Sequence, residues 1–179
     1  MICVVDKNNK IINIINADSP TRENERICYP WNSLWEQYTD VEPLEYAKQR
    51  KLSEVSRWTA ANITGGFVSS ASGEPVRYDS DKETQLTMQG IALNVSTPLF
   101  AAKYPNGCPV RGVAEGAESK SVYWLTPEQV MQWMADLSMH IGSCKQAGWA
   151  KQAEVDACKS VDEVNAITLG GDESVPSER

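Results

Sequence analysis

Four residues that begin at Thr126, Thr-Pro-Glu-Gln, constrain the fold of this chain more than any other feature of its sequence. The Thr126 hydroxyl suits a helix cap, Pro127 suits the first helical position, and Gln129 can return a hydrogen bond to the cap residue. A helix is therefore predicted to start at Pro127 and to run past Ile141, and an extension to Cys158 with an interruption near Gly148 stays open.

Apolar side chains recur along this helix at alternating spacings of four and three residues: Val130, Met134, Leu137, Ile141 and Cys144. This is a heptad pattern just over two repeats long, whereas a coiled coil needs about three or four repeats. The preferred interpretation is an amphipathic helix packed on a sheet. A seam for homo-oligomer formation through Val130, Met134, Leu137 and Ile141 stays open as the alternative.

The N-terminal residues have a different pattern. Two β-branched runs, residues 2–5 and 11–15, flank a polar turn and predict a β-hairpin. A polar loop is expected over residues 18–26. The rest of the chain predicts, in order, a helix from Pro43 to Gly65, a hairpin over 67–78, a helix over 82–94, a loop or irregular hairpin over 98–120, a short strand over 122–125 and a last helix over 160–167.

These elements predict the α+β class, with short antiparallel β-hairpins, three to four helices and an N-terminal β-hairpin module. We expect residues 1–42 to form the hairpin and an aromatic segment, residues 43–168 an α+β domain, and residues 169–179 a flexible tail.

Charge and cysteine content exclude several classes of function. The net charge of −7 disfavours an electrostatic grip on nucleic acid or on anionic lipid. The five cysteines are an odd number without a Cys-x-x-Cys spacing, so free thiols in a reducing cytoplasm are expected. The sequence shows neither a secretory signal nor a run of about 20 apolar residues, which predicts a soluble protein without membrane contact.

Aromatic side chains are biased toward rings with a polar edge, with six Trp and six Tyr against two Phe. Four of these rings, Tyr29, Trp31, Trp35 and Tyr38, lie within ten residues of one another beside Pro30. Such rings are favoured where one face is buried and the other meets a partner, so this aromatic segment is the candidate partner-binding site. For Trp58, Trp124 and Trp133 we expect core packing.

The sequence contains few candidates for catalytic residues. His140 is the only histidine, and nothing in the sequence brings it to Cys108, the cysteine predicted to lie in a loop. We therefore expect no catalytic residue, no cofactor and no metal site. Asp79 and Asp81 resemble a sparse metal loop, but helix capping explains the same carboxylates.

The run from Arg77 to Gly90, Arg-Tyr-Asp-Ser-Asp-Lys-Glu-Thr-Gln-Leu-Thr-Met-Gln-Gly, precedes a loop and then the run Val-Tyr-Trp-Leu-Thr-Pro-Glu-Gln that begins at Val122. This order resembles a domain family of unknown function found in bacteriophage tail and tail-fibre proteins, over about residues 45–168. Asp79, Asp81 and Gln85 match the family's motif. We expect them to define the fold, with the acids capping a helix and Gln85 tying that helix to the hairpin backbone.

The resemblance implies a phage tail-fibre-associated protein, either an assembly chaperone or a minor tail component, which binds a tail-fibre or other tail protein. Such a protein would act in the host bacterial cytoplasm during assembly, and a minor component would stay in the virion tail. The alternative is a small phage protein that sequesters a host ligand or blocks a host enzyme.

Overall fold

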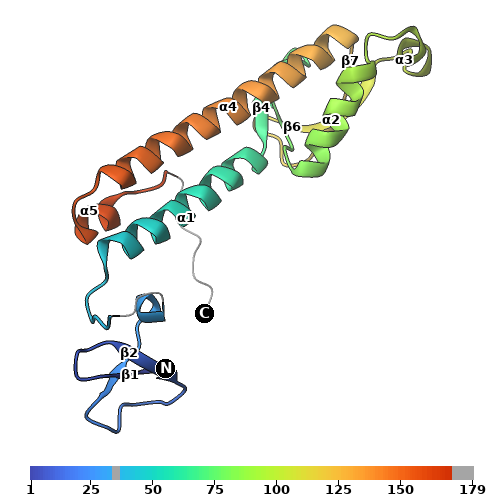
Figure 1. The fold of residues 1–179 in the computed structure, drawn as a ribbon. Coiled ribbons are helices and arrows are strands. Elements are labelled where there is room, and N and C mark those ends of the chain that lie inside the picture. The colour runs from blue at the N-terminus through green and yellow to red at the C-terminus, as the bar shows by residue number, and fades with distance from the viewer. Residues whose placement is uncertain (34–36, 171–179) are drawn as a thin grey trace. The chain divides into compact units, whose positions relative to one another are not determined.

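The β-branched and amphipathic runs form two small antiparallel sheets and five α-helices in a computed structural model that describes residues 1–33 and 37–170 (Figure 1). The predicted α+β class is confirmed. Contacts within the chain divide it into two compact units. Unit 1 comprises Met1–Ser53 with Ala153–Arg179, and unit 2 comprises Glu54–Gln152.

The sheet of unit 1 has three strands in the order β2-β1-β3. The predicted hairpin is confirmed as β1 (Ile2–Val5) and β2 (Ile11–Ile15), joined by a turn in which Asn9 adopts a φ of 62°. Asparagine tolerates this left-handed conformation better than most residues, which suits it to a tight turn.

The predicted loop over residues 18–26 is wrong at its C-terminal end, because β3 (Glu25–Ile27) begins there. Glu25 lies opposite Val4 and Ile27 lies opposite Ile2, so β3 completes the sheet on the far side of β1. A strand of three residues with two charged members shows no apolar alternation. Only its pairing with β1 makes it a strand.

The helices of unit 1 meet around a small apolar cluster. A 3₁₀ turn, η1 (Pro30–Ser33), precedes α1 (Leu44–Thr64), and α5 (Val161–Ala166) follows α4 (Pro127–Ala157). The cluster joins one face of the first turns of α1 to α5 and to the segments that flank it: Leu44, Ala47, Cys158, Val161, Val164 and Ile167. The predicted helices at both ends of the domain are therefore confirmed.

The sheet of unit 2 has four strands in the order β4-β5-β6-β7: Phe67–Ser69, Val76–Tyr78, Cys108–Ala114 and Ser121–Leu125. The predicted hairpin and last strand are confirmed, as is the helix α2 (Lys82–Asn94). The expected loop over 98–120 instead holds α3 (Pro98–Lys103) and the longest strand, β6. Pro105 and Gly107 lie in the turn before β6 and Gly116 lies in the turn after it, whereas Pro109 and Gly112 lie within β6 itself.

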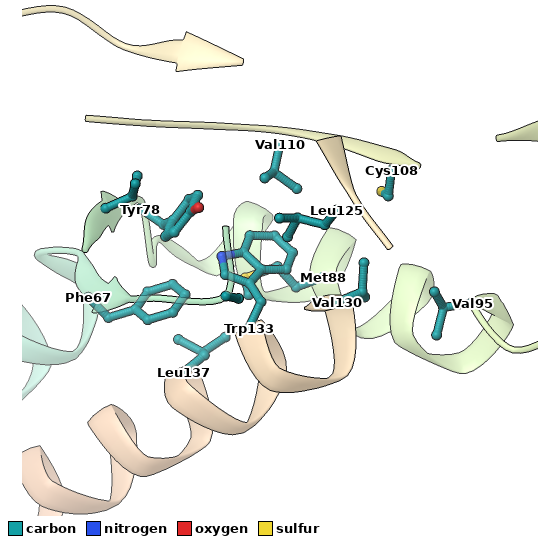
Figure 2. Packing of buried hydrophobic residues seen from close by; sticks show 12 residues of the cluster. Phe67, Tyr78, Met88, Val95, Cys108, Val110, Leu125, Val130, Trp133 and Leu137 are labelled. Atoms are coloured by element: carbon teal, nitrogen blue, oxygen red, sulfur yellow. The ribbon is translucent and has the colours of Figure 1, made fainter. Parts of the chain in front are cut away.

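The core of unit 2 lies between the sheet and α4 (Figure 2). Trp133 of α4 lies among Tyr78, Met88 and Leu125, and is 4% exposed. The expected core position of Trp124 is wrong, because this side chain is 57% exposed. Alternation along β7 turns its neighbours Tyr123 and Leu125 inward and therefore turns Trp124 outward.

The predicted interruption of the long helix near Gly148 is also wrong, because α4 continues through this residue. Gly148 is buried where α4 passes close to α1 within unit 2. A Cβ atom here would lie 2.4 Å from Thr59 Oγ1. The glycine therefore serves a close helix approach and not a helix break.

The predicted division into residues 1–42, 43–168 and 169–179 stays a prediction. Most of the predicted flexible tail, from residue 171 onward, lies outside the described residues.

Candidate functional site

The aromatic segment is part of unit 1, and its described rings, Tyr29, Trp31 and Tyr38, are half-buried. Tyr29 and Trp31 stack with ring centroids 5.0 Å apart and an angle of 5° between the ring planes. Trp31 also meets Tyr46 of α1 edge to face at 5.8 Å. The segment therefore has a defined arrangement before any partner arrives.

The polar edges of two of these rings form hydrogen bonds inside the chain. Trp31 Nε1 donates to the Thr39 carbonyl at 3.0 Å, and the Tyr38 hydroxyl donates to the Ile27 carbonyl at 3.1 Å. What the half-buried rings leave to solvent is therefore mainly apolar ring surface. Trp35, the fourth predicted ring, lies outside the described residues.

One exposed aliphatic residue adjoins these rings. Ile27 is 55% exposed, and its carbonyl holds the Tyr38 hydroxyl. We call Tyr29, Trp31, Tyr38 and Ile27 the aromatic surface.

The Asp79–Gln85 motif organises the start of α2. Asp81 is the N-cap residue, because its Oδ1 accepts from the backbone N–H groups of Glu83 and Thr84, each at 3.0 Å. Together with the Thr84 hydroxyl, these donors lower the pKa of the Asp81 carboxyl. Gln85 Nε2 donates to the Ser80 carbonyl at 2.6 Å, which ties α2 to the end of the hairpin.

Asp79 has a different place from the one expected, because it forms an ion pair with Lys120 and is not the N-cap of α2. Beside it lies a cavity of about 330 Å³. Its lining combines carboxylates and Arg111 with apolar side chains, among them Met88 and Trp133. Trp133 Nε1 is buried and lacks a hydrogen-bond partner within the described chain. In Figure 2 this nitrogen lies on the side of the Tyr78 ring.

The heptad seam of α4 faces the core of its own unit. Val130 and Leu137 are buried in that core, and Met134 and Ile141 pack against it as partly buried side chains. This is the arrangement of an amphipathic helix packed on a sheet. Self-association through the seam stays a prediction, and these four side chains do not form a separate exposed stripe.

The thiols and the single imidazole form one pair that the sequence analysis missed. His140 Nε2 donates to the Asn62 carbonyl at 3.0 Å, and Cys144 Sγ lies 3.7 Å from Nε2 and 3.9 Å from Nδ1 of the same ring. The four-residue spacing on a helix was the available signal. Burial raises the pKa of the Cys144 thiol, and burial also raises the pKa of Cys108 in β6. Both effects favour the thiol over the nucleophilic thiolate.

Two features are absent from the described residues, a cluster of metal ligands and a membrane-spanning helix. No group of three or more His, Cys, Asp or Glu side chains within them is arranged to hold a metal ion. Within the same residues, no helix combines the length and the apolar character needed to span a bilayer.

Residues 46–168, more than two thirds of the chain, match a family described as a domain of unknown function, DUF4376. The chain belongs to this family. Comparisons with curated proteins and with solved structures gave no significant match.

The DUF4376 domain includes the Asp79–Gln85 motif, the cavity and the seam of α4, whereas the aromatic surface precedes it. Tyr46, the ring that Trp31 meets edge to face, is the first residue of the match. The two candidate sites therefore belong to different parts of the chain. The aromatic surface lies in the residues that precede the domain.

Proposed function

We propose that this protein is associated with phage tail fibres and acts by binding a tail-fibre or other tail protein, as an assembly chaperone or as a minor tail component. The tie to phage tails comes from the resemblance of the sequence runs that begin at Arg77 and Val122. The observation that supports binding is the aromatic surface, in which Tyr29 stacks on Trp31 while Trp31 and Tyr38 bond their polar edges inside the chain.

The mechanism is the shielding of apolar surface by mass action. A fibre subunit exposes apolar surface before it assembles, and this exposed surface favours aggregation. Half-buried aromatic rings offer a large contact area at a low cost in side-chain entropy, since they are already held by stacking. A chaperone that binds only the unassembled subunit lowers the free concentration of the species that aggregates.

Co-expression with the neighbouring fibre gene tests the proposal. The fibre subunit is expected to co-purify with the wild-type chain and to lose most of this binding in Trp31→Ala and in Ile27→Lys. Ile27→Lys is the sharper variant because this side chain is 55% exposed and its loss removes little internal packing. Trp149→Ala, at a tryptophan of α4 that is 62% exposed, is the matched control and should bind as wild type.

Two outcomes would overturn the proposal. One is a fibre subunit that is soluble, correctly assembled and unbound without this protein. The other is equal binding by Ile27→Lys and by Trp149→Ala, which would show that the aromatic surface takes no part.

The alternative function, sequestration of a small host ligand, is favoured by one observation, the cavity of about 330 Å³ beside α2. Its volume is at the lower end for ligand pockets, and it combines an apolar floor with a few polar groups. A thermal-shift screen of host metabolites tests this function. A ligand of the cavity should raise the melting temperature of the wild type but not that of Arg111→Ala.

A further inference from the structure

Two cysteines of unit 1 lie beside each other on the N-terminal sheet. Cys3 lies in β1, and Cys28 directly follows the last residue of β3. The two strands run antiparallel, with Cys3 opposite Arg26. The Cys28 N–H donates to the Met1 carbonyl at 3.1 Å, which continues this ladder by one residue. Because Cys28 lies two residues from Arg26, its side chain shares a face of the sheet with Cys3, as a diagonal neighbour.

The two thiols also interact directly. Cys3 is fully buried, with 0% of its surface exposed, whereas Cys28 is half-buried. Burial, followed by a hydrogen bond with the Cys28 thiol, raises the pKa of Cys3 to about 12. Both cysteines are free thiols in the structure. The pair therefore combines a protected thiol with one that a reagent can reach from solvent.

The geometry of the pair is close to that of a disulfide. Diagonal neighbours across two antiparallel strands have Cα atoms about 7–8 Å apart, and disulfides span up to about 6.8 Å. An approach of about 1 Å is therefore enough to join the two sulfur atoms. Cys28 lies beyond the end of β3, so this shift leaves the pairing of Glu25–Ile27 with β1 in place.

We propose that Cys3 and Cys28 form a reversible disulfide when the protein meets a disulfide oxidant such as glutathione disulfide. The Cys28 thiolate, the more accessible group, attacks one sulfur of glutathione disulfide and releases one glutathione thiolate. Cys3 then loses its proton and attacks Cys28 Sγ, which forms the bond between the two cysteines and releases the second glutathione. The protein thiols lose two protons and two electrons, and glutathione disulfide is reduced to two molecules of glutathione.

The two steps differ in rate for a physical reason. Little of the Cys3 thiol is ionised at neutral pH, because its pKa is about 12. Its attack is nevertheless intramolecular, since Cys3 lies beside the sulfur atom that it attacks. Glutathione attached to Cys28 should therefore appear first and then decline as the internal disulfide grows.

The disulfide would act on the aromatic surface, because Cys28 lies between two of its residues, Ile27 and Tyr29. The Cys28 thiol donates to the Tyr29 carbonyl at 3.8 Å, and the Ile27 carbonyl accepts from the Tyr38 hydroxyl. A bond to Cys3 would fasten this segment covalently to β1. In a reducing cytoplasm the pair stays as two thiols, whereas an oxidising medium would close it. Formation of the disulfide requires no fibre partner, so it is independent of the proposed function.

Oxidation of the purified full-length chain with glutathione disulfide, followed by alkylation of the remaining thiols, tests the pairing. Tryptic cleavage places Cys3 in the peptide of residues 1–7 and Cys28 in the peptide of residues 27–48. Mass spectrometry is expected to find these two peptides joined, and treatment with dithiothreitol should separate them.

Cys28→Ser is the test variant, because it removes the accessible thiol and should leave Cys3 reduced and alkylated. Cys144→Ser, at a half-buried thiol of α4, is the matched control and should form the disulfide as wild type. Oxidation should raise the melting temperature of the wild type and of Cys144→Ser, because the cross-link constrains the unfolded chain, but not that of Cys28→Ser. Circular dichroism of the reduced proteins verifies that each variant is folded.

The proposal is overturned if, in the wild type, glutathione stays on Cys28 or both thiols stay reduced. It is equally overturned if Cys28 joins Cys108, Cys144 or Cys158 as often as it joins Cys3. The bond would then reflect random oxidation and not the pairing across the sheet.

Discussion

Gly148 is one of two glycines of unit 2, with Gly112, at which a Cβ atom would lie only 2.4 Å from a neighbouring side chain. Thr59 Oγ1, the nearest atom to a Cβ built at Gly148, donates to the Val55 carbonyl at 2.8 Å and cannot move without breaking that bond. Gly148→Ala should therefore destabilise the protein, because an overpacking cost of about 1–3 kcal/mol outweighs the gain in helix propensity.

Gly142→Ala is the control, because no atom lies within 4 Å of a Cβ at this position of the same helix. It should leave stability unchanged or raise it by up to about 1 kcal/mol. Urea denaturation of both variants makes the comparison. If Gly148→Ala proved as stable as Gly142→Ala, the close approach to Thr59 would be refuted.

Glu25 is a carboxylate that the chain holds with several donors. Its Oε2 accepts from the Thr21 backbone N–H at 2.7 Å, from the Thr21 hydroxyl and from the Arg22 backbone N–H. These bonds, with that from the Thr21 backbone foremost, lower the pKa of Glu25 although the side chain is buried. The ionised form is therefore the one that stabilises unit 1.

The stability that Glu25 contributes should be complete at neutral pH. It should be lost as the pH falls from the ordinary glutamate pKa through the lowered one. Glu25→Gln should thus lower the melting temperature at pH 7, and its difference from the wild type should shrink in acid. Glu23→Gln, at an exposed neighbour, should follow the wild type at every pH. A difference for Glu25→Gln that does not change with pH would contradict this role.

At the scale of elements, α4 decides the stability of unit 2. Leu137 is 3% exposed in the core beneath the sheet, and Met139 two residues later is 71% exposed. Leu137→Ala should lower the free energy of unfolding by about 2–5 kcal/mol. Met139→Ala should change it by less than about 0.5 kcal/mol.

The same pair of variants separates a core helix from an oligomer seam. If the seam packs only in the core of its own chain, Leu137→Ala should lower the free energy of unfolding by the same amount at every protein concentration. A loss that appears only at concentrations where the wild type self-associates would instead support an intermolecular seam.

At the scale of the whole molecule, the proposed function assigns partner binding to the aromatic surface, which precedes the DUF4376 domain. Deletion of residues 1–42 removes the N-terminal sheet and the rings of the segment, but it leaves α1, which begins at Leu44. The shortened chain should keep its helical circular dichroism signal and lose binding to the co-expressed fibre subunit. Binding retained at wild-type strength would place the partner site within the domain.

The elements were predicted correctly where the local sequence has a clear helix cap or a clear apolar periodicity. Thr126–Gln129 predicted the start of α4, and Asp81 predicted the start of α2, because a cap depends on atoms within one turn of the chain. The strand β3 and the outward position of Trp124 were missed or misplaced. Both depend on which strand lies alongside, and a single short segment does not encode its neighbour.

By itself the sequence determined the α+β class, the N-terminal hairpin and the starts of α2 and α4, and residues 46–168 match the DUF4376 family. Only the tertiary structure decided that Gly148 serves a helix contact, that Asp79 pairs with Lys120, and that Glu25–Ile27 pairs with β1 as the strand β3. The physical reason is the separation along the sequence over which each interaction acts. Caps and periods act between residues near in sequence, whereas close approach, ion pairing and strand order act between residues that only the fold brings together.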